Sequence, residues 1–89
     1  MEQTTVVIDE AKSIVYGARV QEYGSADECF SRIAAVWSAM RGDKYTAQDV
    51  ALMMIGFKIA REAGKHKHDN LVDICGYAEI LETLHQKSE

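Results

Sequence analysis

Proline is absent from this chain, cysteine occurs only twice, and no hydrophobic run is long enough to cross a membrane. Because proline breaks helix interiors, its absence suits continuous helices. The longest apolar run, from Val50 to Phe57, is far shorter than the ~20 residues of a transmembrane helix. The N-terminus has Glu2 and lacks the cationic region of a secretory signal. We therefore expect a cytoplasmic protein without a membrane partner.

Positive charge is also scarce. The chain has 10 Lys and Arg residues against 14 Asp and Glu residues, a formal net charge of −4. Proteins that bind nucleic acids in general present a basic face, so we expect no nucleic-acid partner. The balance still leaves room for a local pocket that binds phosphate.

The length of 89 residues predicts a single domain over 1–89, with short mobile tails at 1–4 and 86–89. A hydrophobic content of 47% indicates a folded chain rather than a disordered one. Small domains bury a modest share of their surface and often gain stability by association. Because the apolar surface is large for this size, we expect a symmetric homo-oligomer.

Apolar residues recur at intervals of three and four through most of the chain and predict an all-α fold, a compact bundle of four helices. Two capping boxes mark helix starts, because a Ser or Thr side chain and a carboxylate three residues later bond each other's backbone N–H. These are Ser25 with Glu28 and Thr46 with Asp49. The expected helices cover about residues 5–16, 25–41, 46–64 and 69–86.

The third expected helix is the most informative segment. It is apolar on every side from Val50 to Phe57, which is typical of a central, buried helix. Lys58 and Arg61 follow directly, and a buried cation needs a partner. Asp69 and Asp73 lie four residues apart on the next helix. Either these groups pair with each other, with Lys58 bonded to Asp73 or Asp69, or they face an anionic ligand together.

Other interpretations of these polar residues stay open. Arg61 can simply complement the helix dipole near a C-terminus, and Asp69 can cap the next helix. Gly76 and Tyr77 share the face of Asp73, and a glycine inside a helix usually marks a close approach of another element or a ligand. His66-Lys67-His68 offers at most two metal ligands, fewer than zinc sites need. The two cysteines are expected to be buried thiols.

A ligand would draw on three segments. Arginine suits bidentate recognition of phosphate and tyrosine can stack on a base, which makes Arg19 and Tyr23 of the loop 18–24 candidates. Carboxylates and amides can read sugar hydroxyls or base edges. No residue is assigned to catalysis or to a metal. The candidate ligand-binding residues are Arg19, Tyr23, Lys58, Arg61, His68, Asp69, Asn70, Asp73 and Tyr77.

Four segments together carry a resemblance. They are Arg19-x-x-x-Tyr23-Gly24, Phe30-x-Arg-Ile-Ala-x-x-Trp37, Asp49-Val-Ala-x-Met-Met with Lys58-Ile-Ala-Arg61, and His68-Asp69-Asn70-x-x-Asp73-x-x-Gly76-Tyr77. Over roughly residues 8–80 the chain resembles a family of small phage and prophage proteins of unassigned function, which implies the cytoplasm of a host cell. More distantly it is similar to the all-α MazG-like nucleotide pyrophosphohydrolases and to nucleotide-modification-associated domains.

The MazG-like enzymes hold Mg²⁺ with carboxylates from two helices, typically Glu-x-x-Glu and Glu-x-x-Asp. Here Lys58 and Arg61 occupy the region of the first pair, which disfavours an enzyme. We therefore expect a protein that binds a nucleotide-like phosphorylated ligand without cutting it or using a cofactor, and that in a phage could sequester a host immune signal nucleotide. The alternatives are a Mg²⁺-dependent pyrophosphohydrolase and an interaction module without a ligand.

Overall fold

The computed structural model describes residues 6–18 and 25–87, and all regular structure within them is helical. The predicted all-α fold of four helices is therefore confirmed for these residues. The first helix continues into a wider π-helical turn, and the last one runs one residue past its expected end. The elements are α1 (Val7–Ser13), η1 (Ile14–Ala18), α3 (Ala26–Arg41), α4 (Ala47–Gly64) and α5 (His68–Lys87).

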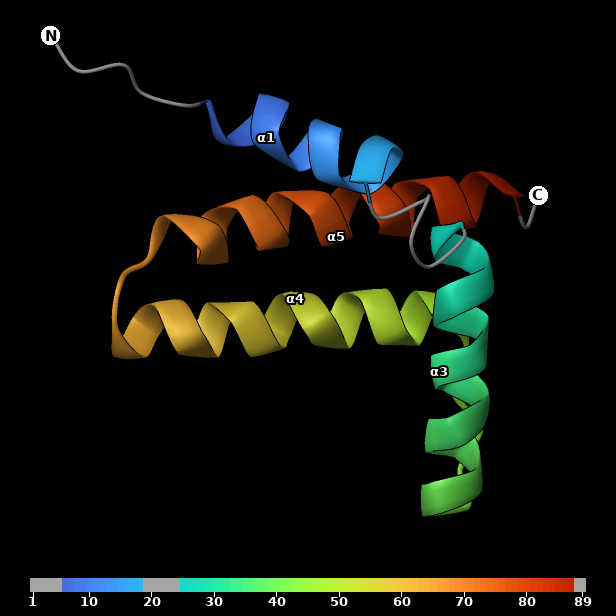
Figure 1. Ribbon diagram of the computed structural model, residues 1–89. Coiled ribbons are helices and arrows are strands. Elements are labelled where there is room, and N and C mark those ends of the chain that lie inside the picture. Colours follow the sequence, from blue (N-terminus) through green and yellow to red (C-terminus); the bar gives the residue numbers. More distant parts are fainter. Residues whose placement is uncertain (1–5, 19–24, 88–89) are drawn as a thin grey trace, which may run out of the picture.

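Helices α4 and α5 form the centre of the arrangement. They lie side by side and antiparallel, joined by the short connection 65–67 (Figure 1). Helix α1 lies along the face of α5 that is turned away from α4, and α3 crosses the end of the α4–α5 pair almost upright. The two helices pair antiparallel because so short a connection returns the chain along its own path.

The core lies where α3, α4 and α5 meet. Val50 and Ala51 of α4 are completely buried, and the small alanine lets the neighbouring helix approach closely. Tyr77 and Trp37 pack against this core from its margins. Around them the buried cluster consists of Phe30, Ala34, Val50, Ala51, Ile80 and Leu84.

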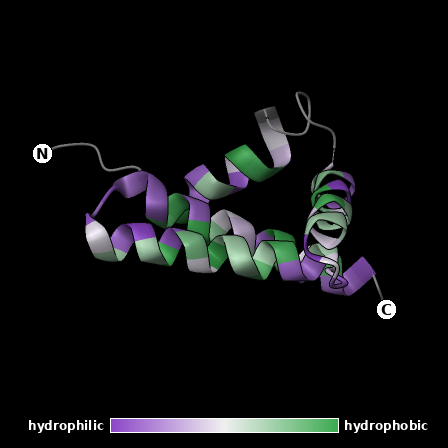
Figure 2. Ribbon diagram, turned by 90° about the horizontal axis from the view of Figure 1, so that it is seen from below, coloured by the Kyte–Doolittle hydropathy of each residue, from purple (hydrophilic) through white to green (hydrophobic). Residues whose placement is uncertain are grey.

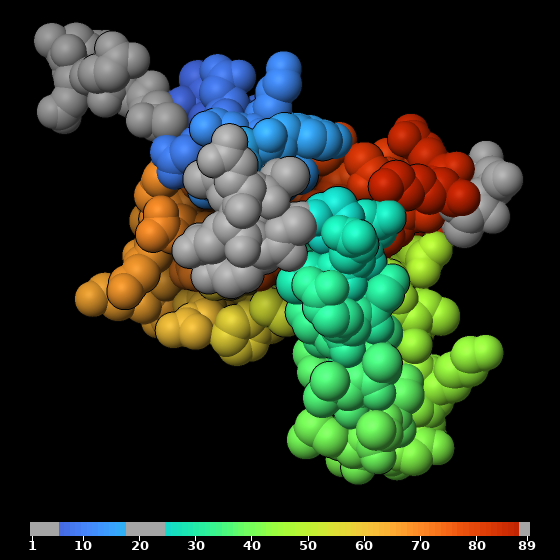
Figure 3. Space-filling model, turned by 45° about the vertical axis from the view of Figure 1, so that its right-hand side comes forward, coloured from blue at the N-terminus to red at the C-terminus, as the bar shows by residue number. Residues whose placement is uncertain are grey.

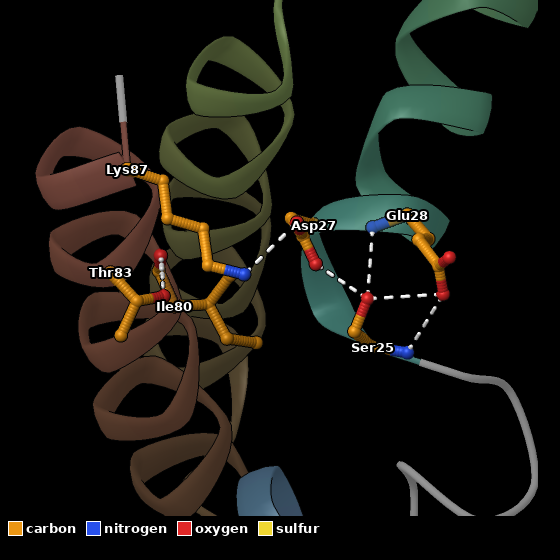
Figure 4. Close-up of polar contacts among 6 residues, drawn as sticks. All are labelled: Ser25, Asp27, Glu28, Ile80, Thr83 and Lys87. Atoms are coloured by element: carbon orange, nitrogen blue, oxygen red, sulfur yellow. Dashed lines mark hydrogen bonds and ion pairs between the residues drawn. The ribbon is translucent and has the colours of Figure 1, made fainter. Parts of the chain in front are cut away.

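Both predicted capping boxes are present. The Thr46 hydroxyl accepts the Asp49 backbone N–H at 3.1 Å, and the Asp49 carboxylate accepts the Thr46 N–H at 2.9 Å. Ser25 and Glu28 exchange the same two bonds at the start of α3 (Figure 4). These bonds satisfy N–H groups that the first turn of a helix otherwise leaves without partners. Asp49 is therefore a capping residue, as its position predicts.

Helix α5 is also tied to the start of α3 by an ion pair. Lys87 Nζ lies 3.0 Å from the carboxylate of Asp27, which the Ser25 hydroxyl also contacts (Figure 4). The Ser25 hydrogen bond, and then Lys87, lower the pKa of Asp27. Both partners are well exposed, with side-chain accessibilities of 63% and 35%, so the pair contributes little to stability.

The expectation that the third helix is buried on every side is wrong for the single chain. Leu52 is 58% exposed and Ile59 is 53% exposed. The reason is that α5 covers one side of α4 and α3 covers its first turns, so the outer face has no neighbouring helix in the described part of the chain (Figure 2). Two stripe residues of other helices are likewise exposed, Ile8 at 66% and Met40 at 75%.

The first helix also departs from its expected form. The α-helix ends at Ser13, and the chain passes through the π-helical turn η1 with a non-helical Gly17 (φ −114°, ψ −109°). This segment packs on α5 at Gly76, where an added Cβ would lie 3.4 Å from a Val15 methyl carbon. The glycine within α5 is therefore explained by close approach of another element. Cys29 and Cys75 are partly buried rather than fully buried.

Gly42 generates a first prediction. It ends α3 with φ +80°, in the left-handed region, and donates its N–H to Ser38 O at 2.9 Å. A Cβ disfavours this conformation, so Gly42→Ala should lower the free energy of unfolding by about 1 kcal/mol. Urea unfolding followed by circular dichroism measures the loss. Asp43→Ala in the same loop is the control, and an equal loss in both variants would contradict the explanation.

Candidate ligand-binding site

Lys58 and Asp73 form an ion pair that joins the middle of α4 to α5. Lys58 Nζ lies 2.8 Å from Asp73 Oδ2, and the two side chains are 18% and 26% exposed. The expected pairing of Lys58 is thus confirmed, with Asp73 rather than Asp69 as its partner. A pair in this half-buried setting is screened less than a surface pair, and each charge also neutralises the cost of burying the other.

Phe57 adds an aromatic ring beside this pair, a role that the sequence reading missed. Its ring centroid is 5.6 Å from Lys58 Nζ and 5.2 Å from Arg61 Cζ, so two cations flank one ring. The ring itself is 46% exposed. Part of the signal was present in the sequence, because Phe57 and Arg61 are four residues apart and therefore lie on one face of a helix.

Of the two cations beside the Phe57 ring, Arg61 is the one that stays available to a ligand. Its side chain is exposed, and within 6–18 and 25–87 no carboxylate lies at ion-pair distance from its guanidinium. The simple reading of Arg61 as a residue that complements the helix dipole also fits its place in the last turn of α4. Arg61, Phe57 and the Lys58–Asp73 pair together form what we call the α4 cation cluster.

Glu62 organises the connection between α4 and α5. Its carboxylate contacts His66 Nδ1 at 2.5 Å and accepts the Lys67 backbone N–H and the Asn70 side-chain amide, both at 3.1 Å. These bonds lower the pKa of Glu62, the His66 contact most of all. Asn70 is 5% exposed and also donates to the Lys65 carbonyl at 3.4 Å. Asn70, proposed as a ligand contact, therefore holds the turn.

His68 and Asp69, two further candidates, lie at the start of α5. His68 Nε2 lies 3.2 Å from a Glu10 carboxylate oxygen and so links the start of α5 to α1. Asp69 is exposed and sits inside the first turn, since α5 begins at His68. The alternative of Asp69 as the cap residue is therefore wrong, because Asp69 is the second helical residue and lies two positions past the cap position at Lys67. Its charge still complements the positive end of the helix dipole.

Tyr77 belongs to the core margin rather than to an open site. Its ring lies 6.0 Å from that of Phe30, centroid to centroid, at a tilt of 44°. Arg19 and Tyr23 lie outside the described residues. Of the nine candidates, the structure brings Lys58, Arg61 and Asp73 together and places His68, Asp69 and Asn70 near the α4–α5 connection.

A concavity lies between α1 and α5. It has a volume of about 440 Å³ and is mostly apolar, with Tyr16 and Glu79 at its edge. The Tyr16 hydroxyl donates to the Glu79 carboxylate, and this bond raises the pKa of Tyr16. The full lining is Ile8, Ala11, Lys12, Tyr16, Cys75, Ala78 and Glu79.

Within the described part of the chain, no three His, Cys, Asp or Glu side chains come close enough together to hold a metal ion. The two histidines near the connection contact carboxylates of different helices instead. No helix over 6–18 or 25–87 has the length and hydropathy needed to span a membrane.

The fold and the site define a small all-α domain with a cation cluster on its longest apolar helix. Comparison with known families identifies it further: the chain belongs to the family described as "Domain of unknown function (DUF6378)", whose profile matches residues 6–85. This membership agrees with the resemblance to a small phage family of unassigned function.

Two phage proteins are similar to this chain. One is the Gene 55 protein of Mycobacterium phage L5, 48% identical over 81 residues that cover 88% of this chain and 51% of the relative. The other is the Gene 55 protein of Mycobacterium phage D29, 34% identical over 82 residues that cover 91% and 54%. The chain thus spans about half the length of these relatives. No solved structure matches it.

The Lys58–Asp73 pair generates a second prediction. In a double-mutant cycle with Lys58→Met and Asp73→Asn, the coupling energy should be about 1–2 kcal/mol, between the values of exposed and fully buried pairs. Urea unfolding of the four proteins measures it. The exposed pair Asp27–Lys87 is the control, with an expected coupling below about 0.5 kcal/mol. Additive effects at Lys58 and Asp73 would refute the coupling.

Glu62 generates a third prediction, on pH. Its folded-state pKa lies below the ordinary value of 4.5, so its contribution is present above that pH and is lost as the pH falls through the lower folded-state value. Glu62→Gln should therefore lower Tm at pH 7 and flatten the fall of Tm below pH 4.5. Thermal melts across pH measure this. Glu82→Gln is the control, because the Glu82 carboxylate accepts a hydrogen bond from Gln86 of the same helix and so represents a carboxylate bonded within α5. An unchanged acid profile in Glu62→Gln would contradict the prediction.

Proposed function

We propose that this protein binds a nucleotide-like phosphorylated small molecule at the α4 cation cluster. The observation that carries the proposal is the half-exposed Phe57 ring flanked by two cations, one of them an arginine without a carboxylate partner in the described regions. An exposed ring is a stacking surface for a base, and a guanidinium binds phosphate through two parallel hydrogen bonds. The two features lie within one turn of α4.

The Lys58–Asp73 pair supports the same proposal in a second way. A lysine already paired keeps its ammonium in place, and the Asp73 carboxylate can accept hydrogen bonds from ribose hydroxyls or from a base edge. Because Lys58 neutralises the Asp73 carboxylate, a phosphate bound at Arg61 would lie beside a neutral ion pair rather than beside a free negative charge.

The relatives are phage proteins, which supports the biological setting that we propose. A phage protein that binds a nucleotide without cutting it can sequester a host immune signal nucleotide in the host cytoplasm, and we propose this role. We also propose that the chain acts as a symmetric homo-oligomer. The second candidate function, an interaction module without a ligand, is favoured by the ion-paired Lys58 and by the exposed apolar face of α4.

Titration calorimetry tests the ligand proposal and is the fourth prediction. At least one member of a panel of mono-, di- and cyclic nucleotides should bind without turnover. Arg61→Ala should weaken that binding at least tenfold, because it removes the charged bidentate contact, while Lys65→Ala changes it less than threefold. Lys65 is the matched control, being an exposed cation just past the end of the same helix.

Three results would overturn the proposal. No binding by any nucleotide favours the interaction module. Mg²⁺-dependent release of pyrophosphate favours the MazG-like hydrolase, which needs a carboxylate set to hold the metal. Equal losses in Arg61→Ala and Lys65→Ala show attraction to general positive charge rather than a site at Phe57 and Arg61. Circular dichroism spectra of both variants establish that the fold is retained.

A further inference from the structure

The outer face of α4 carries no charge over four turns. With ~3.6 residues per turn, Gly56 and Ala60 lie at the centre of this face. We call it the α4 outer face. It consists of Leu52, Met53, Gly56, Phe57, Ile59, Ala60, Ala63 and Gly64, all of them exposed. An exposed, uncharged face of this length marks an interaction surface.

Helix α3 extends the surface into a corner. It stands across the end of the α4–α5 pair and projects beyond α4, which leaves an open angle between the two helices (Figures 1 and 3). Two large apolar residues of α3 are also exposed, Val36 at 56% and Met40 at 75%. In these views α3 and α4 therefore stand at an angle like the two arms of an L.

We propose that a second copy of this chain covers the α4 outer face, with its α4 antiparallel to the first. The first argument is size complementarity. The large residues Leu52 and Met53 lie in the first half of the face, whereas the second half holds the small residues Ala60, Ala63 and Gly64. When two antiparallel copies are centred between Gly56 and Ala60, the large side chains of each copy lie against the small ones of the other. The contact therefore occurs twice, as the two-fold symmetry of an isologous interface requires.

The second argument is charge complementarity at the two ends of the face. Asp49 lies at the start of α4 and on the side of Gly56, and Lys65 and Lys67 follow its end. Antiparallel copies bring each acidic start next to a basic end, and they also oppose the helix dipoles favourably. A parallel pair instead places Asp49 against Asp49 and Leu52 against Leu52, and leaves gaps at the small residues.

The uncharged centre with a charged rim is the usual composition of a stable interface, whose core is depleted of charge. Rotating one L by a half-turn lets two copies interlock, so that each α3 projection flanks the α4 end of the other copy. The corner is then filled from both sides. The interface does not use Arg61 or the Lys58–Asp73 pair, whereas Phe57 at its edge also belongs to the proposed ligand site. The oligomeric mass is therefore measured without a nucleotide, so that failure of the interface and failure of the ligand proposal are distinguishable.

Light scattering after size exclusion tests the interface and is the fifth prediction. The wild-type protein at micromolar concentration should have at least twice the 9.9 kDa mass of the chain. Gly56→Leu should reduce that mass, because its side chain enters the point of closest approach; in the single chain the added Cβ meets nothing within 4 Å. Ala78→Leu, exposed on α5 beside α1, is the matched control and should keep the wild-type mass.

A second variant and a cross-link complete the test. If circular dichroism shows Gly56→Leu to be unfolded, Leu52→Glu decides, since a charge within the face should dissociate the copies. With Cys29 and Cys75 changed to alanine, Leu52→Cys/Ala63→Cys should form a covalent dimer on mild oxidation, whereas Leu52→Cys alone should not. A monomeric wild-type protein, or an unchanged mass in the folded face variant, overturns the interface. Dimers cross-linked through Leu52→Cys alone overturn the antiparallel register.

Discussion

The close packing of α4 on α5 is the constraint on which the other features of this domain depend. Ala51 is completely buried at this contact and offers no side chain beyond a methyl group, so the two helix axes can approach. Once the helices are this close, a lysine on one and an aspartate on the other meet at 2.8 Å. The same approach leaves the opposite side of α4 without a neighbouring helix among residues 6–18 and 25–87.

Polar side chains then hold α4 and α5 together at the connection 65–67. Glu62 accepts bonds from the turn and from Asn70, so the only described buried polar side chain has its amide satisfied. An unpaired amide at this position would cost a full desolvation penalty, which is why a carboxylate one turn before the end of α4 is matched to an asparagine on α5. Side chains that a sequence offers as ligand contacts can therefore be hydrogen-bonded within the fold instead.

The site and the outer face share one helix but use different sides of it. Phe57 lies at their border, with Arg61 on one side and the uncharged stripe centred on Gly56 on the other. A helix that is apolar nearly all round needs cover on every side. In this chain α5 supplies it for one side and α3 for the first turns, and the proposed second copy supplies it for the remainder.

Local sequence signals determined much of this structure by themselves. The capping boxes at Ser25 and Thr46 and the periodic apolar spacing predict α3, α4 and α5 to within one residue, because their physics acts over a single turn. The antiparallel return of α5 follows from a connection of three residues. The need of Lys58 for a carboxylate partner was also visible, since burial of a lone charge is costly.

The tertiary structure alone decided which groups meet. Asp73 rather than Asp69 reaches Lys58, Asn70 turns inward to Glu62, and Tyr77 packs on Phe30, because these choices depend on the rotation and offset of packed helices. The exposure of Leu52 and Ile59 had the same origin. Periodicity shows that a face is apolar, but only the placement of neighbouring helices shows whether this chain covers it.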